Sequence, residues 1–110
     1  MENYNRVEKD EYGTYYFLDN EFHRLDGPAI KYNDGEKEWY QNGLLHRIEG
    51  PAIKCNDGTK YWYQNGKQHR IDGPAVECIN GEKSWYYEGE FIECNSQEEF
   101  ERLIKLKLFW

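Results

Sequence analysis

The stretch His46-Arg47-Ile48-Glu49-Gly50-Pro51-Ala52-Ile53 decides the fold, because close copies of it begin 23 residues earlier at His23 and 23 residues later at His69. A constant interval of this length is typical of repeat proteins, in which each unit buries its apolar surface against its neighbours. The sequence therefore predicts a single domain built around three 23-residue units.

Each unit carries two turn signals around a tryptophan. An Asp-Gly or Asn-Gly pair precedes the tryptophan, and an Asn-Gly pair follows it in the first two units. Both residues of such pairs tolerate positive φ, which favours two-residue hairpin turns. We therefore expect about two short strands per unit and a mainly β, single-layer antiparallel meander. The three tryptophans are Trp39, Trp62 and Trp85.

Two-residue turns would fix which side chains share a face of this sheet. They place Ile30 opposite Trp39, with equivalent pairs in the later units, and the second turn places His46 beside Trp39. One face is expected to hold the structural Trp, Ile or Val, and His residues, the histidines being His23, His46 and His69. The opposite face is expected to hold the alanine of each Pro-Ala, pairs such as Lys31 with Glu38, and the tyrosines Tyr40, Tyr63 and Tyr86.

The ends of the chain depart from the repeat, as the outer units of stacked arrays usually do. A capping box at Ser96 and Glu99 predicts a helix over 100–109. Its apolar stripe is Phe100, Leu103, Ile104 and Leu108. The expected divisions are an N-terminal cap strand region at 1–22, three hairpin repeats at 23–90, and a C-terminal strand and capping helix at 91–110.

The C-terminal helix has two possible roles. Laid over the last hairpin, it would cover an edge of the sheet that otherwise invites aggregation. Leu106, Phe109 and Trp110 fall partly off the apolar stripe, so the tail is also a candidate contact surface for a partner or a second copy.

The composition restricts the partners and the compartment. With 21 acidic and 14 basic residues the formal net charge is −7, which disfavours nonspecific binding to nucleic acid and to anionic membranes. No apolar run approaches the roughly 18 residues of a membrane span, and the first residues contain no apolar signal segment. Three cysteines without CxxC spacing fit reduced thiols. We expect a cytoplasmic protein.

The sequence predicts no catalytic site, metal or cofactor. Equivalent histidines would lie two strands apart, about 9 to 10 Å, whereas the ligands of one zinc ion lie within about 2 Å of it. The same separation excludes a disulfide between Cys55 and Cys78. The serines, Ser84 and Ser96, lack a nucleophile-elbow context, and neither a phosphate loop nor a dinucleotide fingerprint occurs.

The stretch WYQNGKQHRIDGPAVECINGEKSWY, residues 62–86, resembles the MORN repeat, a β-hairpin unit with an aromatic-rich strand and an Asn-Gly or Asp-Gly turn. The resemblance covers residues 14–90, and it is closer still to short repeat proteins of bacteriophages and large viruses that carry HRxDGPA and WYxNG units. It implies a sheet of hairpins and a viral source, which would place the protein in the host cytoplasm, but it implies no activity. His-Arg replaces the usual His-Gly of the family, so its lipid binding is not carried over.

Three classes of function are compatible with these observations. The first is a non-catalytic protein-binding module, a virus-encoded inhibitor that binds and blocks a host defence protein through the tyrosine row. The second is an acidic decoy that imitates nucleic acid. The third is a structural protein that self-assembles through a sheet edge or through the C-terminal tail.

Overall fold

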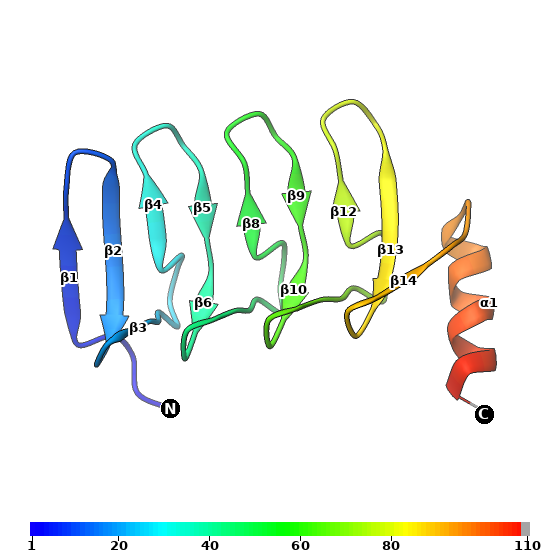
Figure 1. Cartoon of the computed structure of the whole chain (residues 1–110), viewed down its shortest axis with the longest axis horizontal. Coiled ribbons are helices and arrows are strands. Elements are labelled where there is room, and N and C mark those ends of the chain that lie inside the picture. Colours follow the sequence, from blue (N-terminus) through cyan, green and yellow to red (C-terminus); the bar gives the residue numbers. More distant parts are fainter. Residues whose placement is uncertain (109–110) are drawn as a thin grey trace.

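The computed structural model describes residues 1–108, which form an antiparallel meander of short strands followed by one helix, α1 (Gln97–Leu108). Figure 1 shows four long hairpins side by side, with α1 at the C-terminal end. The long hairpins pair β1 (Arg6–Lys9) with β2 (Gly13–Leu18), β4 (Ile30–Tyr32) with β5 (Lys37–Glu38), β8 (Ile53–Lys54) with β9 (Lys60–Tyr61), and β12 (Val76–Glu77) with β13 (Lys83–Tyr87). The predicted mainly β meander with a C-terminal helix is confirmed.

A short hairpin follows each long hairpin. These pair β2 with β3 (Glu21–Phe22), β6 (Tyr40–Gln41) with β7 (Leu44–Leu45), β10 (Tyr63–Gln64) with β11 (Lys67–Gln68), and β13 with β14 (Glu90–Ile92). The first two complete units therefore have four strands each rather than two, because the strand that carries the tryptophan is interrupted there, as between β5 and β6. The main sheet runs in the order β1-β2-β4-β5-β8-β9-β12-β13-β14.

The two turns of a unit have different lengths. Asn42 and Gly43 have φ values of 52° and 78°, as a two-residue hairpin turn requires. In the long hairpin the Tyr32 N–H instead donates to the Glu36 carbonyl at 2.9 Å, which leaves three residues in the loop. Only the last of them, Gly35, has a positive φ, of 102°. The predicted two-residue turn is wrong for the long hairpins, where a three-residue loop closes the strands.

The extra turn residue shifts the pairing and changes which side chains share a face. Ile30 lies opposite Glu38 rather than Trp39, and Lys31 lies opposite Lys37 rather than Glu38. The Tyr40 hydroxyl donates to Glu38 Oε1 at 3.0 Å, so the tyrosines share a face with the Ile and Val residues. The two predicted face assignments are therefore wrong for Ile and Val, and wrong for the alanines, which lie on the tryptophan face.

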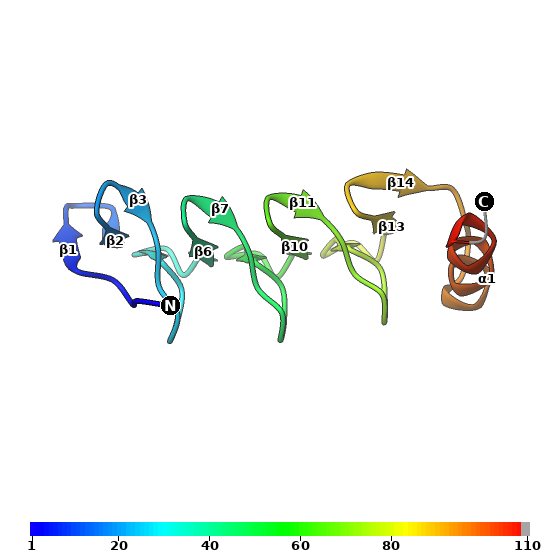
Figure 2. The ribbon, with the colours of Figure 1, turned by 90° about the horizontal axis from the view of Figure 1, so that it is seen from below.

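A layer of loops covers the tryptophan face. The loops are residues 23–29, 46–52 and 69–75, and Figure 2 shows them projecting to one side of the ribbon. Each loop buries its alanine completely and lays an arginine on an aromatic ring of the preceding unit. The Arg47 guanidinium carbon lies 3.9 Å from the centre of the Trp39 ring, and that of Arg70 lies 3.8 Å from the centre of Trp62. Cation–π contact and burial together stabilise this layer.

Helix α1 takes the place of a fourth loop. Trp85 is 7% exposed and packs against Phe100 and Ile104, and its indole N–H donates to Gln97 Oε1 at 2.8 Å. The predicted cap is present, since the Glu99 N–H donates to Ser96 Oγ at 3.1 Å. The apolar stripe is narrower than expected, because Leu108 is exposed.

Candidate functional site

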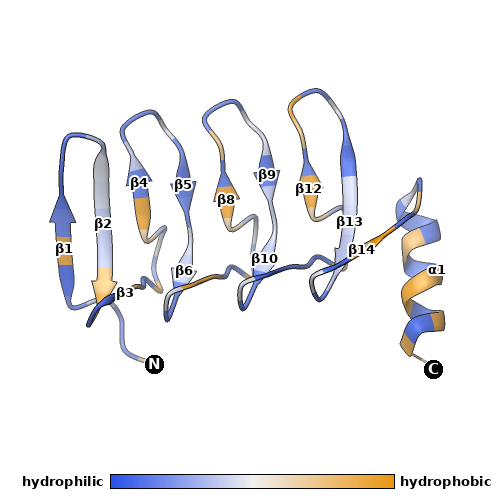
Figure 3. Cartoon of the chain, viewed as in Figure 1, coloured by the Kyte–Doolittle hydropathy of each residue, from blue (hydrophilic) through white to orange (hydrophobic). Residues whose placement is uncertain are grey.

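The sheet face opposite the loop layer has no second layer within residues 1–108, and we call it the tyrosine face. Figure 3 shows hydrophobic segments recurring along it at β4, β8 and β12. In register, its side chains are Tyr15, Phe17, Ile30, Tyr32, Glu38, Tyr40, Ile53, Tyr61, Tyr63, Val76, Ser84 and Tyr86. A large aromatic surface left open on a single sheet is the kind of surface that binds another molecule.

Ring contacts continue this face across the units. The centroids of Phe17 and Phe22 lie 4.9 Å apart in a stacked arrangement, and Phe22 lies 5.3 Å from Tyr40. At the other end Tyr86 meets Phe91 edge to face at 5.5 Å. These geometries are favourable for aromatic pairs and hold the rings in place before any partner arrives.

The three predicted contact tyrosines occupy equivalent positions in β6, β10 and β13. Each of Tyr40, Tyr63 and Tyr86 is half-buried, so part of every ring is covered by its neighbours and part is available. Burial is the first cause that raises the pKa of Tyr40 and of Tyr63, so both phenols are neutral at physiological pH and can donate hydrogen bonds.

Two neighbouring carboxyl groups lie at the β4–β5 hairpin of this face. A hydrogen bond with the Glu38 carboxyl, burial, and the charges of Glu38 and Asp34 raise the pKa of Glu36 to about 7. Within residues 1–108 neither Glu36 nor Glu38 belongs to an ion pair, since the ion pairs there involve Glu8, Asp26, Asp72, Glu77 and Glu90. The tyrosine face is therefore aromatic with a polar, proton-sharing corner.

The histidines link successive units. The His46 N–H donates to the Trp39 carbonyl at 3.0 Å, which is the predicted neighbour, and its ring Nδ1 accepts the Asn65 N–H of the next short hairpin at 3.0 Å. His69 accepts the Glu88 N–H in the same way at 2.8 Å. An Nδ1 that accepts a backbone N–H is unprotonated, so each neutral ring carries its hydrogen on Nε2. No cluster of three or more potential metal ligands occurs in residues 1–108.

The second predicted contact surface, the C-terminal tail, is only partly described. Leu106 is 50% exposed on α1, whereas Phe109 and Trp110 lie outside the described residues. Helix α1 has 12 residues and is the only helix in residues 1–108, so no helix there is long enough to cross a membrane. The thiols of Cys55, Cys78 and Cys94 are free.

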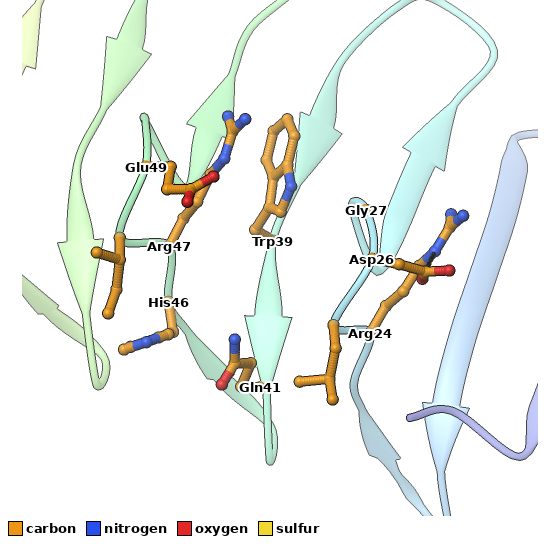
Figure 4. A pocket seen from close by; sticks show the side chains of 10 residues that line it. Arg24, Asp26, Gly27, Trp39, Gln41, His46, Arg47 and Glu49 are labelled. Atoms are coloured by element: carbon orange, nitrogen blue, oxygen red, sulfur yellow. Dashed lines mark hydrogen bonds and ion pairs between the residues drawn. The ribbon is translucent and has the colours of Figure 1, made fainter. Parts of the chain in front are cut away.

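The loop layer forms shallow grooves that the sequence analysis missed. One groove of about 690 Å³ lies between two neighbouring loops, with Trp39, Arg24 and Arg47 among its walls (Figure 4). An equivalent groove of about 490 Å³ lies one unit further on, over Trp62. The aliphatic residues Leu25, Ile48 and Ile71 stand exposed beside these grooves. The repeat alone could have indicated them, since they follow His-Arg at the same interval.

A row of lysines on the loop side was also missed. Lys31 pairs with Lys37, Lys37 with Lys54, and Lys54 with Lys60 across four neighbouring strands. The signal was present in the sequence, because Lys37, Lys60 and Lys83 recur at intervals of 23 residues. The expected pairing of Lys31 with Glu38 concealed it.

Comparisons of this chain with protein-family models, with curated proteins and with solved structures gave no match. The resemblance to MORN repeats therefore stays a prediction.

Proposed function

We propose that this chain is a non-catalytic protein-binding module whose contact surface is the tyrosine face. The observation that carries the proposal is the asymmetry of the sheet: loops and α1 cover the tryptophan face, while the aromatic face opposite has no cover within residues 1–108. Tyrosine offers a large contact area and a hydroxyl at little cost in side-chain entropy, which suits protein recognition.

The finer proposal is that the module is a virus-encoded inhibitor that acts in the cytoplasm by occupying a host defence protein. It is supported by the small size of the chain and by the resemblance of its repeats to those of phage and large-virus proteins. A rigid surface without chemistry of its own can inhibit a partner only by covering a functional surface, so we expect stoichiometric rather than catalytic inhibition.

The alternative of an acidic decoy is weaker. A nucleic-acid mimic needs carboxylates spaced as a continuous track, and the tyrosine face places Tyr61 and Ser84 at the positions in later units that correspond to Glu38. Only the first complete unit therefore has an acidic residue at this position.

Affinity capture with paired variants tests the proposal. The double variant Tyr40→Ala/Tyr63→Ala removes two central rings, and the matched control Ile48→Ala/Ile71→Ala removes exposed apolar groups from the loop side. A partner captured from host lysate by the wild type and by the control, and lost with the tyrosine variant, supports the assignment. Equal capture by all three proteins places the contact elsewhere.

Quantitative binding to the captured partner then sharpens the test. Tyr63→Ala is expected to weaken binding by about 1 to 3 kcal/mol, the usual cost of removing a central aromatic anchor. If Tyr63→Ala binds normally and Leu106→Ala abolishes binding in a folded protein, the contact surface is the C-terminal helix.

A further inference from the structure

The side of the sheet that carries the loops collects most of the positive charge of an acidic protein. Register places Lys9, Lys31, Lys37, Lys54, Lys60 and Lys83 in one line across the sheet, separated only by Thr14 and Glu77. We call these six residues the lysine row. Together with Arg24, Arg47 and Arg70 of the loops, the row contains nine of the 14 basic residues.

The arginines and the lysine row belong to the same surface. Arg70 lies over Trp62 and also pairs with Glu77 at 2.7 Å, and Glu77 stands directly opposite Lys60 and Lys83. Figure 4 shows the Arg24 and Arg47 side chains running up the face from their loops, with the guanidinium ends pointing away from the short hairpins. The loop side therefore carries two adjacent lines of cations.

Nothing in the described chain compensates the lysine row. The ion pairs within residues 1–108 involve Arg6, Arg24, Arg70 and Lys107, and none includes a lysine of the row. Like charges directly opposite each other on neighbouring strands destabilise a sheet. Lysine commonly protects the edge strands of sheets, but β4, β5, β8 and β9 are internal.

We propose that the lysine row is a second interaction surface, independent of the tyrosine face, and that it binds an extended acidic segment of a partner protein. Neighbouring strands are about 4.8 Å apart, so the part from β4 to β13 spans about 24 Å and would match seven or eight extended residues. Carboxylates of such a segment would neutralise cations that now repel one another.

The shape of the row favours a polypeptide over nucleic acid. The indole faces of Trp39 and Trp62 lie under guanidinium groups and are not free to stack on bases, which single-stranded nucleic acid requires. The row is also narrow, because the acidic residues Asp34 and Asp57 lie in the turns at one end of its strands. A wide duplex would meet those carboxylates, whereas a single extended chain need not.

Fluorescence anisotropy with a labelled (Glu-Gly)5 peptide at low ionic strength tests the proposal. Lys37→Gln/Lys54→Gln removes the centre of the row, and Lys67→Gln/Lys105→Gln removes the same charge from a short hairpin and the helix. We expect the first variant to lose at least tenfold in affinity and the control less than threefold. Amide NMR shifts on addition of the peptide should centre on Lys37 and Lys54.

Three outcomes would overturn the proposal. Equal losses in the two variants would show that only net charge matters, and absence of peptide binding to the wild type would remove the surface. Tighter binding of an octamer of deoxythymidine than of the peptide would assign the row to nucleic acid. Misfolding does not confuse the result, because removing two repelling lysines is expected to leave the melting temperature unchanged or raise it.

Discussion

The two faces of this sheet carry similar numbers of large side chains but treat them differently. On the loop side each ring receives a cover, which is an arginine for Trp39 and Trp62 and helix α1 for Trp85. On the tyrosine face the rings contact one another across the units and leave their outer surfaces open. The difference separates a face that stabilises the array from a face that is free to bind.

A thin sheet can afford only one such free face. The molecule measures 45 × 32 × 17 Å, so the loop layer provides most of the burial that holds the strands together. The completely buried side chains of at least methyl size are the three alanines, His23 and Phe100, and each belongs to the loops or to the helix that replaces them. Stability and recognition are therefore assigned to opposite sides, and substitutions on the two sides should have different consequences.

The largest expected contrast is between adjacent residues on opposite faces. Trp62→Ala removes the ring under Arg70 and should lower the free energy of unfolding by about 3 to 5 kcal/mol. Tyr63→Ala, one residue later, should cost less, because its ring is covered only by side neighbours. Urea unfolding of both variants measures the difference. Equal costs would mean that the tyrosine face is part of the core and is not free for a partner.

The next effect concerns a hydrogen bond of the loop layer. His23 is completely buried, with Nδ1 accepting the Asn42 N–H at 2.9 Å and Nε2 at 2.7 Å from the Glu2 carbonyl. His23→Leu leaves both groups without their partner and should cost about 1 to 3 kcal/mol. His46→Leu is the comparison, since the Asn65 N–H it leaves is exposed to water and should cost less. Thermal unfolding ranks the pair, and the reverse order would contradict this role of burial.

Much of the fold could be predicted because the repeat interval states where each hairpin begins. The Asn-Gly turns and the cap at Ser96 have local causes, positive φ and a side-chain acceptor, so their positions follow from the sequence. The substitution of α1 for a fourth loop could not be predicted, because it depends on Trp85 needing a cover that only the three-dimensional arrangement reveals.

The sites could be predicted only in part because a single turn residue decides the register. Asn33-Asp34-Gly35 permits either a two-residue or a three-residue loop, and the choice decides whether Lys31 meets Glu38 or Lys37. The tyrosine row was found, since tyrosines at equal intervals share a face under either register. The lysine row and the place of Ile30 were missed for the same reason.

A substitution in the third long hairpin tests that register. Gly81 has a φ of 94° and open space around the position of a Cβ, so Gly81→Ala adds backbone strain without a clash and should cost about 1 to 2 kcal/mol. Asn tolerates positive φ better, and Gly81→Asn should cost about half as much. Equal stability of the wild type and the alanine variant would show that this loop does not need its glycine, and would weaken the register that creates the lysine row.

The smallest effect belongs to the tyrosine face and depends on pH. The carboxyl of Glu36 has its pKa raised from 4.5 to about 7, first by the hydrogen bond with Glu38. Between these pH values the folded state binds more protons than the unfolded state, so this group's contribution to stability is complete below pH 4.5 and is lost as pH rises towards 7.

Solvent screens a carboxyl as exposed as that of Glu36, so we expect a loss of less than about 1 kcal/mol rather than the full value of the shift. Glu36→Gln keeps the hydrogen-bonding capacity and cannot ionise, so its unfolding free energy should fall less than that of the wild type between pH 5 and pH 7.5. The matched control Glu93→Gln removes a carboxyl outside this face and should keep the wild-type slope. If Glu36→Gln and the wild type lose stability in parallel over this range, Glu36 and Glu38 do not share a proton, and the polar corner of the tyrosine face is an ordinary pair of solvated carboxylates.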